Sequence, residues 1–76
     1  MRELVEFVAK SLVDHPDDVS TRTHERNDQT IIELEVSPED LGKIIGRQGR
    51  TARAIRTLLN AAGQKTRRRF SLDILD

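Results

Sequence analysis

The chain contains no cysteine, no tryptophan and no tyrosine, and Phe7 and Phe70 are its only phenylalanines. The absence of cysteine excludes a disulfide framework and thiolate zinc sites. The scarcity of aromatic rings excludes base stacking on aromatic platforms as a main binding mode, which argues against the RRM, cold-shock and OB-type classes of nucleic-acid reader. Recognition through the polypeptide backbone and through charge stays open.

Long apolar runs are also missing, since no uninterrupted stretch exceeds three residues. We therefore predict no membrane span and no signal peptide, and the cytoplasm is the expected location. The length of 76 residues suits one small domain covering 1–76. A domain of that size buries only about 60% of the surface of its unfolded chain, so self-association is a reasonable way to bury more.

Residues that carry catalysis or bind metals are sparse as well. The two histidines, His15 and His24, lie in no motif that contains a nucleophile or a set of metal ligands. Without such partner groups, a histidine at a corner or on a strand usually has a structural role. The sequence thus predicts a protein that is not an enzyme and that uses no metal and no cofactor.

Charge is balanced overall, with 13 basic and 13 acidic side chains, but it is divided along the chain. Residues 1–42 carry 4 Lys/Arg and 11 Asp/Glu, whereas residues 43–69 carry 9 Lys/Arg and no acid. Such asymmetry indicates one basic face on an otherwise acidic body, a pattern typical of proteins that bind nucleic acid. The alternative is a set of solvated arginines that neighbouring carboxylates balance, which we favour only for the run Arg67–Arg69.

Hydrophobic periodicity predicts a helix over residues 2–14, with Leu4, Val5, Val8 and Leu12 on one face and Ala9 beside them. His15-Pro16 ends it, because the residue before proline is disfavoured in the helical region. Weak alternation over 19–26 suits an edge strand, and cleaner alternation over 30–36 predicts a second strand. In that second strand the inward residues are Ile32, Leu34 and Val36.

The second half of the chain predicts two helices and a closing strand. Ser37-Pro38 is a strong start for a helix that ends near Ile45. A longer helix begins near residue 50, and Gly63 is its expected C-terminal stop. Its apolar stripe consists of Ala52, Ile55, Leu58, Leu59 and Ala62. A strand follows over 68–74, and the two-helix excursion is long enough for this strand to lie parallel to 30–36.

Between these two helices lies the most informative segment, Ile44-Ile45-Gly46-Arg47-Gln48-Gly49-Arg50. Glycine tolerates positive φ and has no Cβ, so a Gly-x-x-Gly turn lets the backbone approach a partner closely. The free N–H groups and the positive dipole end of the next helix lie beside the turn and favour phosphate. A bare tight turn would need only one of the two glycines. The pattern therefore predicts contact with a nucleic-acid backbone.

The stretch 41–56, LGKIIGRQGRTARAIR, resembles the signature of KH-domain RNA-binding proteins. More narrowly, nearly all 76 residues resemble the KhpA family, the small single-KH proteins of bacteria. The resemblance implies the type II KH fold, an α+β arrangement in the order α-β-β-α-α-β, with a three-stranded sheet covered on one face by three helices.

The resemblance also implies a function. KH domains hold about four nucleotides of single-stranded RNA in a groove, and the Gly-x-x-Gly loop clamps the backbone of the strand. Membership of this family further implies pairing with a second KH protein of the KhpB (Jag-like) type, a possible homodimer, RNA chaperoning, and a link to cell-wall homeostasis and cell shape.

On this hypothesis the backbone amides around Gly46 and Gly49 meet phosphate oxygens, with Arg47, Gln48 and Arg50 close to the same atoms. Lys43 and Arg53 add longer-range attraction. Ile45, Ala52 and an inward strand residue form an apolar floor for bases. A solvated helix face is an equally good interpretation of Arg53 and Arg56.

Two other interpretations stay open from the sequence. Leu41–Asn60 also offers two short helices and an arginine-bearing second helix, as in a helix-turn-helix reader of duplex DNA. The paired glycines and the flanking strands favour the KH interpretation. The other interpretation is a protein-docking module whose contact with RNA is incidental.

Overall fold

The computed structural model describes residues 1–76 and confirms the expected order of elements. These elements are α1 (Arg2–Leu12), β1 (Ser20–Arg26), β2 (Gln29–Glu35), α2 (Leu41–Ile45), α3 (Arg50–Thr66) and β3 (Arg69–Ile74). Short 3-10 turns lie at Pro16–Asp18, Pro38–Asp40 and Arg47–Gly49. None of the helices combines the length and apolar character that a membrane span requires.

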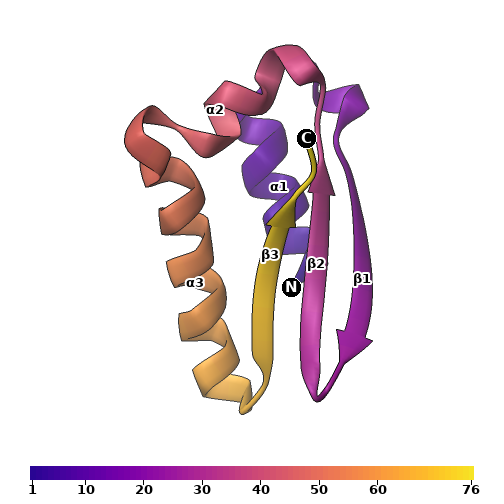
Figure 1. The fold of residues 1–76 in the computed structure, drawn as a ribbon, viewed down its shortest axis with the longest axis vertical. Helices are drawn as coiled ribbons and strands as arrows, with labels where there is room; N and C mark the ends of the chain where they lie inside the picture. The colour runs from indigo at the N-terminus through magenta and orange to yellow at the C-terminus, as the bar shows by residue number, and fades with distance from the viewer.

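The three strands form one mixed sheet in the order β1-β2-β3, with β2 in the centre (Figure 1). β1 pairs with β2 antiparallel, and β2 pairs with β3 in parallel, as predicted. The helices α1, α2 and α3 lie on one face of the sheet, so the chain has the two-layer α+β architecture of a type II KH-like fold.

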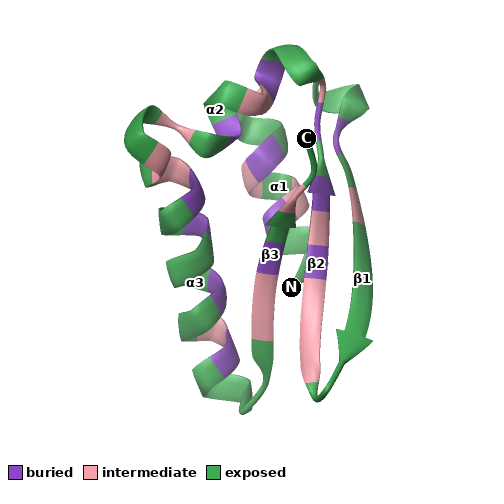
Figure 2. Ribbon diagram, in the orientation of Figure 1, coloured by how far each residue is buried: buried purple, intermediate pink, exposed green.

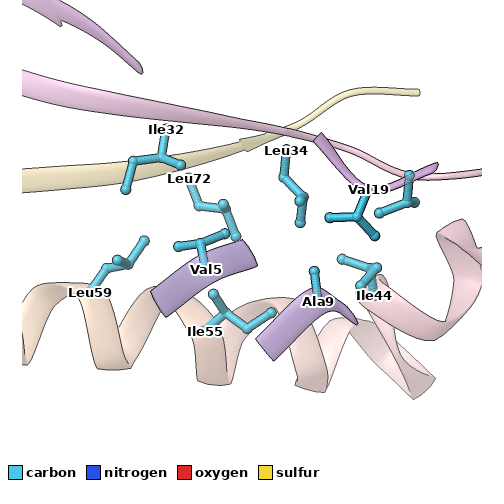
Figure 3. Packing of buried hydrophobic residues seen from close by; sticks show 10 residues of the cluster. Val5, Ala9, Val19, Ile32, Leu34, Ile44, Ile55, Leu59 and Leu72 are labelled. Carbon is cyan, nitrogen blue, oxygen red and sulfur yellow. The ribbon is translucent and has the colours of Figure 1, made fainter. Parts of the chain in front are cut away.

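The core lies between the sheet and the helices, where side chains from both layers meet (Figure 3). The predicted inward residues of β2, Ile32 and Leu34, are completely buried, and Val36 just after the strand is 8% exposed. The alternating pattern therefore correctly predicted which residues of β2 face the core. In Figure 2 the buried positions of α3 follow the side of the helix that faces β3. The remaining core residues are Val5, Ala9, Val19, Ile44, Ile55, Leu59 and Leu72.

The buried positions of α1 agree only in part with the predicted face. Leu4 and Leu12 are 40% and 41% exposed, whereas Val5 and Ala9 are the buried positions. The helix packs on β1, where the hydroxyl of Thr21 donates a 2.9 Å hydrogen bond to Glu6. The helix also ends at Leu12 rather than at residue 14.

Gly63 is not the stop of α3, which continues to Thr66. Arg67 adopts the left-handed conformation with φ of 58°, and the amide of Arg68 donates a 2.8 Å hydrogen bond to the carbonyl of Gly63. This is a Schellman-type ending with arginine at the usual glycine position. Gly63 is buried inside the helix, where a Cβ would collide with the carbonyl oxygen of Arg68. Leu58, expected in the apolar stripe, is 51% exposed.

The start of α2 also differs in detail from the expectation. Pro38–Asp40 forms a 3-10 turn, and the Ser37 side chain makes no capping hydrogen bond. The true helix begins at Leu41 and has only five residues. Asp40, immediately before it, is 1% exposed and is the only buried charged residue of the chain.

Arg67→Gly should stabilise the fold by about 0.5–1 kcal/mol, because glycine adopts the left-handed conformation without the Cβ penalty. Urea denaturation gives the free energy of unfolding. Gln64→Gly, at an exposed position inside the same helix, is the control and should destabilise by roughly 0.5–1 kcal/mol. Equal destabilisation by both substitutions would contradict the assigned helix ending.

Candidate nucleic-acid interface

The loop between α2 and α3 has an unusual backbone. Gly46, Gln48 and Gly49 have φ of 77°, 56° and 74°. Gly46 combines its φ with ψ of 170°, a region that only glycine populates readily. The loop is closed by two hydrogen bonds, from the Gly46 amide to the carbonyl of Gly42 at 2.8 Å and from the Gly49 amide to the carbonyl of Gly46 at 3.1 Å. The predicted Gly-x-x-Gly turn is therefore a compact, hydrogen-bonded structure.

The two glycines are needed for different reasons. At Gly46 a Cβ would overlap the side chain and the amide nitrogen of Thr51 in the first turn of α3, so internal packing excludes any side chain there. At Gly49 the position of a Cβ has no atom within 4 Å. The protein's own packing leaves this space free, so a partner's backbone can approach Gly49 closely.

Exposed side chains with hydrogen-bonding groups surround this loop. Arg47, Gln48, Arg50 and Arg53 are all exposed, and an Arg50 guanidinium nitrogen donates a 3.3 Å hydrogen bond to the Gln48 side chain. No side chain caps the N-terminus of α3. The amide of Arg50 donates to the carbonyl of Arg47 in the preceding turn, and the positive end of the helix still attracts an anion or water. The apolar side chain of Ile45 is 39% exposed at the end of α2.

Lys43 is arranged differently from the arginines. Its ammonium group pairs with the Asp14 carboxylate and lies 3.7 Å from Asp40. The hydrogen bond to Asp14 is the largest cause that raises the pKa of Lys43. Lys43 therefore links α2 to the end of α1. Ala52 is 4% exposed, so it offers hardly any surface to a base.

None of the arginines takes part in an ion pair. The carboxylates pair instead with lysine, histidine and the N-terminal amine, as in Lys10–Glu6 and His24–Glu33. Within the basic block of 43–69, carboxylates therefore pair with Lys43 but with none of the arginines. Because guanidinium groups bind phosphate in a bidentate manner, this arrangement leaves a basic surface suited to a phosphate backbone.

A cavity of about 220 Å³ lies between α3 and β3, and no residue of the Gly46–Gly49 loop lines it. Arg56, Asn60, Ser71 and Phe70 are among its lining residues. β3 is an edge strand, so half of its backbone groups are unpaired on this side. From the sequence, Arg56 was interpreted only as part of a helix face, and Asn60 was not predicted as a site residue. Their i,i+4 spacing beside the apolar stripe was the available signal.

Comparison with known proteins agrees with this geometry. The sequence profile described as KhpA/KhpB, KH domain, matches residues 2–74. RNA-binding protein KhpA of Halalkalibacterium halodurans is 53% identical over 76 residues, the full length of both chains. The protein of the same name from Borreliella burgdorferi is 60% identical over 74 residues, which cover 97% of this chain and 90% of the relative. That from Aquifex aeolicus is 47% identical over 76 residues, which cover 100% of this chain and 96% of the relative.

Alanine at the two loop glycines should have unequal effects on stability. Gly49→Ala introduces only the strain of positive φ, about 1 kcal/mol. Gly46→Ala adds a steric collision with Thr51 and should destabilise by about 2–4 kcal/mol. Thermal and urea unfolding of both variants measure the difference. Equal losses, or a larger loss at Gly49, would show that the loop packs in another way.

Proposed function

The chain belongs to the KhpA/KhpB family of KH domains, and on this basis we propose that it binds single-stranded RNA by clamping the strand's backbone at the Gly46–Gly49 loop. The family is one of RNA-binding proteins rather than of enzymes. The bound segment is about four nucleotides long, as in other KH domains.

The observation that carries this proposal is the empty space above Gly49, next to an uncapped helix N-terminus. The positive φ of 74° already favours glycine at this position, and the absence of a Cβ also lets a phosphate approach the backbone closely. The amides of Gly46 and Gly49 donate hydrogen bonds within the loop, and that of Arg50 donates to the carbonyl of Arg47. Main-chain hydrogen bonds to the phosphate therefore come from other amides of the loop and of the first turn of α3, and the positive helix end adds electrostatic attraction. Arg47 and Arg50, both without an acidic partner, bind the outer oxygens of the same phosphates.

The remaining contacts follow from position. Ile45 offers apolar surface beside the loop, Arg53 attracts the backbone from one turn further along α3, and Gln48 donates hydrogen bonds from the tip of the loop. Lys43 contributes charge while it stays tied to Asp14. Arg56 and Asn60 line a separate cavity further along α3, beside β3, which an RNA longer than the clamped segment can reach. With few aromatic rings available, sequence selectivity is low.

Replacing Arg47 and Gln48 together by aspartate should weaken RNA binding at least about tenfold, because two carboxylates replace groups that contact phosphate. Fluorescence anisotropy with a labelled single-stranded RNA octamer gives the affinity. The double variant Arg22→Asp/Gln64→Asp makes the same chemical change at two exposed positions away from the loop and is the control. Unchanged affinity in the loop variant, or an equal loss in the control, would refute the loop as the clamp.

The physiological role that we propose is RNA chaperoning in the cytoplasm, in complex with a KhpB-type KH protein and linked to cell-wall and cell-shape regulation. This finer role rests on the family relationship. Complementation of a deletion strain provides the test, since the Arg47/Gln48 variant should then fail to restore cell shape and the Arg22/Gln64 variant should restore it. Restoration by the loop variant would separate the cellular role from RNA binding.

Self-association or pairing with the KhpB-type protein needs an apolar surface, and both long helices offer one. Phe7 on α1 is 69% exposed and Leu58 on α3 is 51% exposed. Burying two such side chains contributes about 1.5–3 kcal/mol each. We propose that these exposed helix residues form the pairing surface, which lies on elements other than the Gly46–Gly49 loop.

Phe7→Glu/Leu58→Glu should weaken association with a second copy or with the KhpB-type protein more than tenfold, since it places two charges in an apolar contact. Sedimentation equilibrium measures association with a second copy, and co-purification measures association with the KhpB-type protein. Ser20→Glu/Gln64→Glu, at exposed positions on β1 and near the end of α3, away from Phe7 and Leu58, is the control. Association that survives the Phe7/Leu58 change places the interface elsewhere.

A further inference from the structure

Asp40 is buried at a junction of three segments, and its carboxylate is fully used there. It accepts hydrogen bonds from the backbone amide of His15 at 3.0 Å and from that of Asp14 at 3.3 Å. The Nδ1 atom of the His15 ring lies 3.0 Å from the same carboxylate. The bend after α1 is therefore tied to the residue that precedes α2. Figure 1 shows these two connections side by side at one end of the molecule.

This junction determines where the loop lies. α2 has only five residues, and a helix that short is not stable without external contacts. Its main anchors to the rest of the fold are the fully buried side chain of Ile44 and the junction at Asp40. Gly46 follows the last residue of α2 directly, so any rotation of α2 about its Ile44 anchor displaces the loop.

We propose that Asp40 and His15 are positioning residues for the Gly46–Gly49 loop, and that proton binding by His15 strengthens RNA binding through them. The inference rests on the proposed RNA clamp. Neither residue belongs to that clamp, and both act by holding α2.

The charges around His15 favour its protonated form, in which the junction with Asp40 is strengthened. Its ring faces Asp40 and also Glu39, whose carboxylate lies 3.9 Å from Nε2, with Asp14 and Asp18 on its own segment. The one cation nearby is Lys43, which is held by Asp14 and Asp40. The hydrogen bond to Asp40, followed by the charge of Asp40, raises the pKa of His15 above its ordinary value of 6.5.

Asp40 shows the complementary shift. Burial raises its pKa, but the hydrogen bonds from the His15 ring and from the two backbone amides lower it more, so the net pKa is below 3.8. The stabilisation from Asp40 is therefore present above about pH 4 and is lost in acid. The stabilisation from charged His15 is complete below about pH 6.5 and is lost as the pH rises through its raised pKa. The junction is tightest between these limits.

RNA affinity measured at pH 6 and pH 8.5 and at constant ionic strength tests the inference, with a labelled single-stranded RNA octamer as the probe. Wild-type affinity should be roughly three- to tenfold weaker at pH 8.5. His15→Asn keeps a neutral donor near the position of Nδ1, so its affinity should equal the wild-type value at pH 8.5 and should not depend on pH. His24→Gln removes the other histidine, on the far face of the sheet. This variant should keep the wild-type ratio of RNA affinities at pH 6 and pH 8.5.

An RNA-independent readout separates this inference from the proposed function. In the free wild-type protein, the amide NMR signals of Gly46 and Gly49 should shift with the titration of the His15 ring, and Asp40→Asn should abolish that shift. The positioning role would be overturned if the amide signals of Gly46 and Gly49 do not change as His15 titrates. It would also be overturned if His15→Asn keeps the wild-type ratio of RNA affinities at pH 6 and pH 8.5. Loop signals that follow His15 in a protein without RNA affinity at either pH would support the positioning role and overturn the clamp.

Discussion

The close return of α3 onto α2 at Gly46 is the constraint on which the rest of the structure depends. Thr51 occupies the space that any side chain at position 46 would need, and the chain must pass through a backbone conformation that only glycine adopts readily. This turn sets the direction of α3, so that Ile55 and Leu59 meet β3 in the core. It also leaves the start of α3 and the open side of Gly49 directed away from the packed interior.

The types of basic residue differ in their roles: some make ion pairs within the fold, and others are left exposed without an acidic partner. Lysine and histidine make the ion pairs, among them Lys43 and His15 at the Asp40 junction, whereas the arginines make none. The compact ammonium and the titratable imidazole suit internal contacts with carboxylates. The guanidinium, with its planar fork of donors, suits phosphate. A neutral chain can in this way present one strongly basic surface for a nucleic-acid backbone.

Much of the fold could be predicted because local patterns were unambiguous. Alternation gave the inward residues of β2, and a two-helix connection of sufficient length gave its parallel pairing with β3. The paired glycines, Gly46 and Gly49, predicted the tight turn between α2 and α3. Other features depend on contacts between distant segments. α1 is tied to β1 by the hydrogen bond from Thr21 to Glu6, the packing of Gly63 depends on Arg68, and the burial of Asp40 depends on a bend 25 residues earlier. No local periodicity encodes such contacts, and for the same reason the pairing of Lys43 with Asp14 was not foreseen.

RNA binding through main-chain contact at the Gly-x-x-Gly loop is tested most directly by an NMR titration with a single-stranded oligonucleotide. Amide signals of residues 46–50 should move first and furthest as the oligonucleotide is added, while those on the outer face of β1 stay in place. Binding shown independently by anisotropy, together with unmoved signals at residues 46–50, would contradict the account.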